Sequence, residues 1–272
     1  MPKPRLTVRL LEDHEEFRQC ERVQKNVWGV AGVTGEVLLV TQKYGGIVLG
    51  ALARGKVVGF LYAFLARRSG ELIHWSHMMA IEPGYRDRGL GLRLKLEHRR
   101  RALAQGLRSI AWTYDPLQSR NANLNVARLG ARIAEYVPNC YGELPSLIER
   151  GLPTDRFVVD WRIASRRVER RLGGQAPAFP AALPRVNVTE LRADGLLANR
   201  QLRLNLPQPQ LLVEIPTHTD RMRLLDVRLA RRWRLEMRRV FQHYLRAGCS
   251  VEDFLPPAPR SDGRAFYLLR RS

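Results

Sequence analysis

The chain has little cysteine and no long apolar run, and both absences narrow what it can be. Its 272 residues include only three cysteines, Cys20, Cys140 and Cys249, and no Cys-x-x-Cys pair. This spacing argues against a disulfide framework and a zinc site, so we expect no metal and a reducing cytoplasmic environment. No apolar run approaches the ~20 residues that a membrane-spanning helix needs. The segment 1–10 also lacks the apolar region of an export signal.

Lysine is equally scarce. It occurs at five positions, so arginine supplies the other 41 of the 46 basic residues, and with 26 acidic residues the net charge is +20. A positive chain attracts polyanions such as phosphorylated cofactors and nucleic acid. Residues 1–160 hold 24 basic and 16 acidic residues, net +8, and residues 161–272 hold 22 and 10, net +12. The C-terminal part is therefore the more basic one.

Apolar periodicity and Gly-containing turns predict a mixed α/β fold. Strands are expected over 5–11, 46–53, 56–66, 71–81, 108–114, 131–138 and 156–163, and helices over 13–27, 35–43, 91–106 and 119–129. We expect these to form a first domain over 1–165, followed by a linker rich in Arg, Pro and Ala over 166–185. A smaller α/β domain over 186–272 is predicted to contain strands 209–215, 250–255 and 265–270 and a helix over 220–247.

One segment carries the best functional clue. The apolar strand that ends Met79-Ala80-Ile81 runs through Glu82-Pro83-Gly84-Tyr85 into Arg86-Asp87-Arg88-Gly89-Leu90-Gly91, and a long helix follows. A glycine-rich turn at a helix N-terminus presents backbone N–H groups without helical partners, and the helix dipole favours an anion there. The order predicts a phosphate site. The alternative is a tight turn in which the glycines only relieve strain.

With this unit in place, the first 165 residues resemble the GNAT superfamily of CoA-dependent N-acyltransferases. The order of elements matches, and Arg86, Gly89 and Gly91 match the family signature R/Q-x-x-G-x-G/A. The resemblance implies a mixed sheet whose motif strand and next strand splay apart, with the thioester of the cofactor entering the gap.

The resemblance also implies roles for individual residues. Backbone N–H groups from Arg86 through Asp87, Arg88, Gly89 and Leu90 to Gly91 would hold the CoA pyrophosphate, and the two arginines would add charge-assisted contacts. Met79 and Ile81 would offer backbone groups to the pantetheine amides. The expected cofactor is acetyl-CoA or another acyl-CoA.

Acylation of an amine needs a general base, and a general acid can assist the departing thiolate. His77 has the strand parity of Met79 and Ile81, so the three side chains are predicted to share one face, with His77 as the base. The alternative is a packed core histidine. His74 has the opposite parity and is the weaker candidate.

The strand after the motif helix ends in Tyr114-Asp115. Asp115 is predicted to bind the ammonium group of the acceptor or relay its proton, with an Asx-type cap before Pro116 as an equal alternative. On the helix that follows, Arg120 is a candidate clamp for an acceptor carboxylate, although a solvated surface arginine is the simpler interpretation. Asn121 and Asn125 are four residues apart and are predicted to share a face.

One position departs from the family. Many members carry a tyrosine four residues before the glycine that Gly130 matches, and here that position is Val126, which has no proton to donate. Tyr114, Tyr136 or Tyr141 could substitute as the general acid, and the alternative is that the thiolate leaves unassisted, so the role stays open.

More narrowly, the chain resembles a longer two-part GNAT subgroup whose members are described only as predicted acetyltransferases. The matching stretches are 76–78, 112–117, 119–122, 129–131, 139–142 and 152–156. Some members of this subgroup resemble enzymes that succinylate amino acids. Succinyl-CoA is therefore an alternative donor.

The C-terminal part loosely resembles the back half of such a domain without the glycine signature, and we interpret it as a degenerate half-domain or a dimerisation module. Its helix 220–247 repeats an apolar residue every four positions, which indicates core packing, and its arginines are interpreted as a solvated face. No nucleic-acid-binding motif accompanies them, so a basic nucleic-acid-binding protein is the weakest alternative.

The leading hypothesis is an N-acyltransferase for a small amine or amino acid, as a monomer or homodimer. A CoA-binding protein without activity is second.

Overall fold

The computed structural model describes residues 5–143, 151–175, 182–257 and 263–271. By contacts, these residues form two compact units. Unit 1 holds residues 5–112 and 162–164, and unit 2 holds the other described residues from 113 onward.

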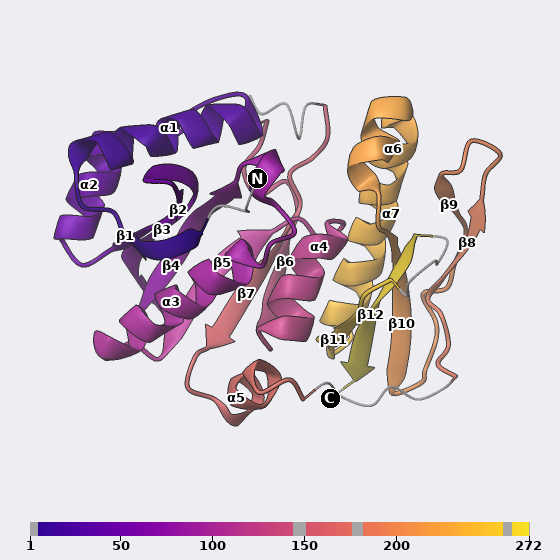
Figure 1. Cartoon of the computed structure of the whole chain (residues 1–272). Coiled ribbons are helices and arrows are strands. Elements are labelled where there is room, and N and C mark those ends of the chain that lie inside the picture. The colour runs from indigo at the N-terminus through magenta and orange to yellow at the C-terminus, as the bar shows by residue number, and fades with distance from the viewer. Residues whose placement is uncertain (1–4, 144–150, 176–181, 258–262, 272) are drawn as a thin grey trace. The chain divides into compact units, whose positions relative to one another are not determined.

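Unit 1 is built on a mixed sheet with the strand order β1-β2-β3-β4-β5 (Figure 1). The strands are β1 (Leu6–Leu10), β2 (Ile47–Ala53), β3 (Lys56–Arg68), β4 (Glu71–Ile81) and β5 (Ser109–Tyr114), of which residues 109–112 belong to unit 1. Neighbours from β1 to β4 are antiparallel, whereas β5 runs parallel to β4. The short turns at Arg54-Gly55 and Ser69-Gly70 produce this meander, because all four residues adopt the left-handed conformation that tight turns need.

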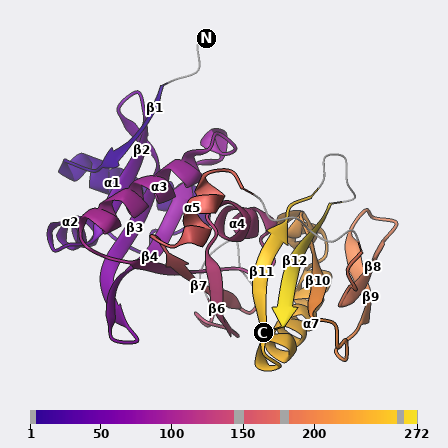
Figure 2. The same ribbon diagram turned by 90° about the horizontal axis from the view of Figure 1, so that it is seen from below.

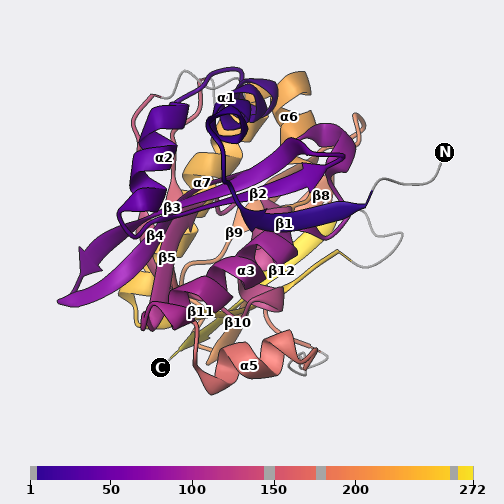
Figure 3. The ribbon, with the colours of Figure 1, turned by 60° about the vertical axis from the view of Figure 1, so that its left-hand side comes forward.

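Helices cover both faces of this sheet. The helices α1 (His14–Trp28) and α2 (Gly35–Lys43) lie on one face, and α3 (Leu90–Ala104) lies on the other, as Figure 3 shows. Asp13 caps α1 by accepting the N–H of Glu16 at 2.8 Å. The face under α1 and α2 packs Phe17 and Leu38 against Phe60 and Tyr62.

The face under α3 has a core of its own. Leu90 and Leu94 of α3 pack against Leu49 of β2 and Leu61 of β3. This contact fixes α3 on the sheet, and with it the position of the turn that precedes the helix. The predicted phosphate-binding turn, residues 86–91, is therefore attached to a helix that is packed on the sheet.

Unit 2 contains smaller sheets and several helices (Figure 2). Its elements are α4 (Ser119–Ala122), a π-helical turn (Asn123–Arg128), β6 (Arg132–Val137), β7 (Arg156–Arg162), α5 (Arg166–Leu172), β8 (Asn187–Leu191), β9 (Leu197–Leu202), β10 (Gln210–Pro216), α6 (Thr219–Leu225), α7 (Val227–Arg246), β11 (Cys249–Leu255) and β12 (Arg264–Arg271). The strands β6 and β7 pair antiparallel, as do β8 and β9, and β10, β12 and β11 form a three-stranded antiparallel sheet.

The second half of the chain differs from the sequence predictions in three places. The predicted linker begins with a helix, α5, whose N-terminus Ser165 caps. The hairpin of β8 and β9 was not predicted. The single helix expected over 220–247 is broken at Asp226, whose extended backbone separates α6 from α7 and whose carboxylate accepts the N–H of Leu229 at 2.9 Å.

The apolar residues that recur every four positions in the helix predicted over 220–247 line the core only in α7, after the break at Asp226. Trp233, Met237 and Phe241 are fully buried, whereas Leu225 is 61% exposed at the end of α6. The prediction of core packing is thus confirmed for α7 and wrong for Leu225. The three-part division at residues 165 and 185 stays a prediction, and residues 176–181 of the predicted linker lie outside the described part. Among the described helices, none is long and apolar enough to cross a membrane.

Candidate active site

The turn before α3 has an unusual backbone. Asp87 and Gly89 both adopt left-handed conformations, with φ of 59° and 74°, and Gly89 is the N-cap of the helix. A left-handed φ is strained for most residues but is free for glycine, which explains the need for Gly89. A Cβ at Gly89 would meet no atom within 4 Å, so the space beside this backbone is open.

The N-terminus of α3 carries donors without helical acceptors. The first helical bond is donated by Arg93 to the carbonyl of Gly89 at 3.1 Å, and no side chain caps the helix. The N–H groups of Leu90, Gly91 and Leu92 precede that bond. They lie at the positive end of a 15-residue helix. The sequence prediction named the N–H groups from Arg86 to Gly91, and of these the Arg86 N–H already donates to the carbonyl of Pro83 at 3.3 Å.

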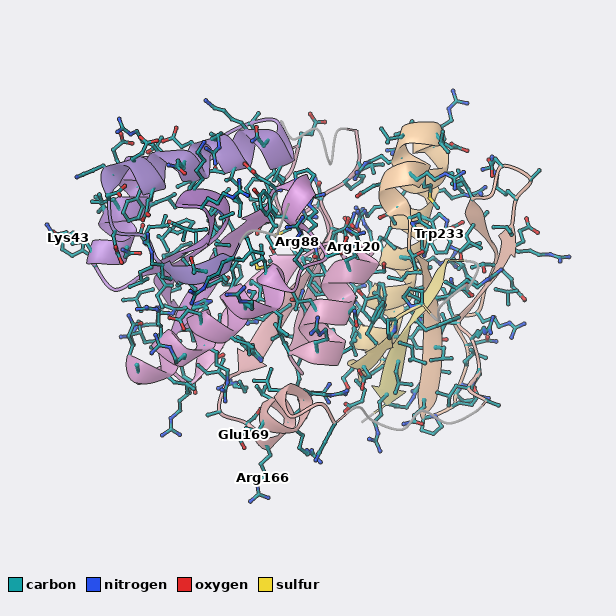
Figure 4. All side chains as sticks on the ribbon, in the orientation of Figure 1. Lys43, Arg88, Arg120, Arg166, Glu169 and Trp233 are labelled. Atoms are coloured by element: carbon teal, nitrogen blue, oxygen red, sulfur yellow. The ribbon has the colours of Figure 1, made fainter. Side chains whose placement is uncertain are left out.

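Two arginines flank this turn. Arg88 is exposed and lies over the ring of Tyr85, with its guanidinium carbon 5.3 Å from the ring centre (Figure 4). The Arg86 side chain is exposed too, but its Nε donates to the carbonyl of Ile81 at 3.0 Å. Arg86 therefore braces the turn against the end of β4.

The edge of β4 that faces β5 opens along most of its length. The parallel pairing joins only His74 with Ile110 and Trp75 with Ala111. From Ser76 to Ile81, β4 continues without a β5 partner within unit 1, while its other edge stays paired with β3 up to Ile81. The two strands thus fork after Trp75, as the resemblance predicts, and leave a row of backbone groups beside the motif turn.

The face of His77 was predicted wrongly. The pairing of β3 with β4 shifts between Tyr62 and Ala63, so that Met78 and Ser76 are paired and His77 is the extra residue of a β-bulge. The bulge turns the His77 ring away from the face of Met79 and Ile81.

On its own face, the His77 ring contacts the rings of Tyr62 and Phe64, with centres 6.0 and 5.9 Å away. The side chain keeps solvent exposure, and the protein around it lowers its pKa by desolvation. A neutral imidazole at neutral pH is the form that a general base requires. Met79 and Ile81 pack instead toward α3.

A buried lysine that the sequence analysis missed lies at the point where the strands fork. Lys95 of α3 is 2% exposed. Its Nζ donates to Ser76 Oγ at 3.1 Å and lies 3.5 Å from the centre of the Trp112 ring. Ser76 and Trp112 are the residues that follow the last β4–β5 pair on each strand. Burial lowers the pKa of Lys95 to about 7.

Two histidines lie beside this lysine. Nε2 of His74 is 3.2 Å from the carbonyl of Gly45, and Nδ1 of His74 is 3.1 Å from Nε2 of His98. Both rings are fully buried, and burial lowers both pKa values. The sequence did carry a signal: Leu94, Lys95, His98 and Ala102 share the buried side of α3, which places two titratable groups in an apolar stripe.

Asp115 and Tyr114, in unit 2, already have partners there. Asp115 accepts two bonds from the buried guanidinium of Arg234, one of them 2.5 Å long from Nη2, and also the N–H of Leu117 at 2.8 Å. Burial alone would raise the pKa of Asp115, but Arg234 lowers it below its usual range. The Leu117 bond matches the capping alternative, and the Arg234 pair was not foreseen.

Tyr114 is fully enclosed. Its hydroxyl lies 3.2 Å from that of Tyr267, and burial raises its pKa. Tyr136 is buried too and donates to Asp155 at 2.5 Å, whereas Tyr141 is 38% exposed and its hydroxyl lies 2.7 Å from that of Thr113.

The helix after Pro116 begins as the α-helix α4 and continues as a wider π-helical turn. Leu129 donates to the carbonyl of Leu124, five residues back, which is the π-helical pattern, and Ala131 donates to Asn125 beyond the end of the helix. Asn121 is exposed and Asn125 is buried, so the expected common face of the two residues is wrong. Arg120 is exposed, in agreement with its interpretation as a solvated surface arginine (Figure 4).

The prediction that the arginines of this helix form a solvated face is wrong for Arg234 and Arg238 of α7. Five of the seven arginines of α7, at positions 228, 231, 232, 239 and 246, are exposed. Arg234 is buried against Asp115, and Arg238 pairs with Asp155 at 2.6 Å. In the part of the chain that the structure describes, no group of three or more His, Cys, Asp or Glu side chains could hold a metal ion.

A family model described as "Acetyltransferase (GNAT) family" matches residues 10–131. The comparison with curated proteins gives no match. Among solved structures, a GNAT acetyltransferase from Streptococcus pneumoniae is 20% identical, with a TM-score of 0.47, covering 57% of this chain and 98% of that chain.

Two further solved structures are comparably similar. The ribosomal-protein-S18-alanine N-acetyltransferase from Escherichia coli is 14% identical, with a TM-score of 0.48, covering 59% of this chain and 96% of its own. An aminoglycoside 6′-acetyltransferase type Ii is 16% identical, with a TM-score of 0.47, covering 59% and 99%. The predicted mixed α/β fold, followed by additional small sheets and helices, is confirmed. Residues 10–131 of this chain are thus a domain of the GNAT acetyltransferase family.

Proposed function

We propose that this protein transfers an acyl group from acyl-CoA to the nitrogen of a small amine or amino acid. The family uses acetyl-CoA. The observation that carries the proposal is the open edge of β4 from Ser76 to Ile81, which leads into the uncapped N-terminus of α3. An extended ligand with a phosphate at one end and amides along its length suits such a path.

The phosphate end fits the motif turn. The N–H groups of Gly89, Leu90 and Gly91 would bind the pyrophosphate of CoA, and the space open beside Gly89 admits its oxygens. Arg88 is exposed and adds a positive charge. Asp87 contributes through its backbone and its left-handed φ.

The amide end fits the strand. The backbone of Met79 and Ile81 would pair with the pantetheine amides, as an added strand does at a sheet edge. The thioester would then lie in the fork that begins beyond Trp75 and Ala111. There the acceptor nitrogen attacks the thioester carbonyl, the carbon–sulfur bond breaks, and CoA leaves.

Direct attack is favoured over an acyl-cysteine. Cys20 is the one cysteine of unit 1, and burial raises the pKa of its thiol to about 12. We assign the general base to His77, whose side chain is exposed although it lies on the face of β4 that packs under α1 and α2. Asp115, a candidate to bind the acceptor ammonium or relay its proton, and Tyr114, a candidate general acid, rank behind because their polar atoms already have partners in unit 2. Arg120 and Asn121 stay candidates for binding the acceptor.

The test is a panel of acetyl-CoA and succinyl-CoA crossed with amino acids and polyamines, read by release of free thiol. Transfer to at least one amine is expected. Thermal shift with CoA is the companion measurement, because ligand at 100 times its Kd stabilises the folded state by about 2.7 kcal/mol. A CoA-induced shift without transfer to any amine would favour the non-catalytic CoA-binding protein, and no shift would refute the cofactor assignment.

A further inference from the structure

The amino group of Lys95 occupies the closed end of the β4–β5 fork. Ser76 of β4 and Trp112 of β5 hold it from either side, at 3.1 Å and 3.5 Å. Both are the first residues beyond the last strand pair, so a ligand that enters the fork meets this amine at its end.

Lys95 lacks the partner that other buried cations of this chain have. Arg234 pairs with Asp115, and Arg171, whose side chain is 7% exposed, pairs with Asp253. Among the described residues, no carboxylate forms an ion pair with Lys95, and desolvation is what shifts its pKa. A buried lysine without a paired carboxylate loses its proton at a lower pH than a paired one does.

The groups that face Lys95 are neutral on every side. On α3 its titratable neighbour is His98, on β4 it is His74, and residues 109–112 of β5 include none. The side chains of β2 and β3 on this face are aliphatic. The cluster therefore holds one primary amine and two imidazoles.

The hydrogen bonds fix the state of both imidazoles. A carbonyl only accepts, so His74 Nε2 donates to Gly45, and His74 Nδ1 must accept from His98 Nε2. His98 Nδ1 then carries a lone pair and no proton, and it is buried without a hydrogen-bond partner. With both rings neutral, Lys95 is the group of the cluster that carries a labile proton near neutral pH.

We propose that Lys95 is the general acid that protonates the departing thiolate of CoA. The inference rests on the proposed function, which places the thioester in this fork. It also fills a role that is otherwise open, because Val126 stands where many relatives carry a tyrosine and cannot donate.

The step balances. The acceptor nitrogen forms the new bond to the acyl carbon, and the electron pair of the carbon–sulfur bond moves to sulfur. The Lys95 ammonium gives its proton to that sulfur and becomes a neutral amine, while the proton lost by the acceptor nitrogen goes to His77 or water. Solvent reprotonates Lys95 once CoA has left the fork. An amine with a pKa near that of the operating pH is suited to this exchange.

Two experiments test the role. In the first, the wild-type protein is labelled with 13C at the ε-carbon of lysine, which gives signals from only five residues. One signal is expected to titrate near pH 7, to vanish in K95M and to shift when CoA is added. This measurement needs no acceptor. The only variant that it requires is folded K95M, which assigns the Lys95 signal.

In the second, wild type, K95M and K43M are compared in acyl transfer to the best acceptor of the panel. Lys43 is an exposed lysine at the end of α2 (Figure 4) and is the matched control. K95M is expected to lower kcat with acetyl-CoA by about 10²-fold and to abolish the fall of kcat at high pH, with the Kd of CoA retained. With p-nitrophenyl acetate as donor, whose leaving group needs no acid, the loss is expected to be much smaller.

The outcomes separate the two proposals. An unchanged kcat and pH profile in K95M, an equal loss with both donors, or a Lys95 signal that titrates near 10.4 would each overturn the general-acid role while leaving the acyltransferase intact. If wild type shows no binding of CoA by calorimetry, the proposed function fails, and this role fails with it.

Discussion

Replacing Lys95 by methionine should change how the stability of the protein depends on pH. In the folded state burial lowers the pKa of Lys95 from 10.5 to about 7, and unfolding restores the ordinary value. Between these two values the unfolded chain binds a proton that the folded chain does not. The free energy of unfolding of the wild type must therefore rise with pH across this window, and the contribution is flat below pH 7.

The magnitude follows from the size of the shift. One pKa unit corresponds to 1.36 kcal/mol, so the difference between 10.5 and about 7 corresponds to roughly 4–5 kcal/mol as an upper value. K95M lacks this titration and leaves Ser76 Oγ without its partner, which costs about 1–3 kcal/mol at every pH. Relative to wild type, K95M should thus be clearly less stable at pH 10 and of similar or greater stability at pH 7.

The assay is urea unfolding of wild type, K95M and K43M at pH 6, 7, 8, 9 and 10. The informative quantity is the difference between wild type and K95M at each pH, because other titrating groups cancel in it. K43M should follow wild type throughout, since Lys43 is exposed. A difference between wild type and K95M that stays constant from pH 6 to pH 10 would refute the assignment of a low-pKa lysine at the fork.

Three further outcomes are expected. Asp115→Ala leaves the buried guanidinium of Arg234 unpaired, so thermal unfolding should show a loss of about 3–5 kcal/mol, and a loss below 1 kcal/mol would contradict a structural role for the pair. His77→Asn should lower kcat by about 10²-fold without weakening CoA binding by calorimetry, whereas an unchanged kcat would remove His77 as the base. Asp13→Ala deletes the cap of α1 and should lower the free energy of unfolding by about 0.5–2 kcal/mol in urea, which an unchanged midpoint would contradict.

Local features of the fold were predictable because local residues determine them. The helix expected over 35–43 and the strand expected over 71–81 are α2 and β4 with the same bounds. Turns at Gly45, Gly55 and Gly70 adopt the left-handed backbone that glycine allows, and they separate the apolar runs clearly. The motif turn was equally readable, since its glycines and the helix after it lie within one short segment.

Features that depend on pairing between distant segments were not predictable. The bulge opposite Tyr62 and Ala63 arises from the register of two strands, and it reverses the face of His77. The bond between Asp115 and Arg234 joins residues 119 positions apart. A lysine in the apolar stripe of α3 was visible in the sequence, but its placement at the fork depends on where two strands stop pairing.

The central claim is that the turn at Gly89 binds the pyrophosphate of CoA, and calorimetric titration of CoA into Gly89→Val and Gly70→Val variants tests it most directly. Gly89 and Gly70 have similar left-handed φ values of 74° and 82°, and a Cβ at either meets no atom within 4 Å, so the backbone strain of the two variants is matched. Gly70 lies in the turn between β3 and β4, away from the motif in the sequence. We expect Gly89→Val to weaken the binding of CoA by tenfold or more in Kd, about 1.4 kcal/mol, while Gly70→Val binds CoA like wild type. Equal affinity in both variants would contradict it.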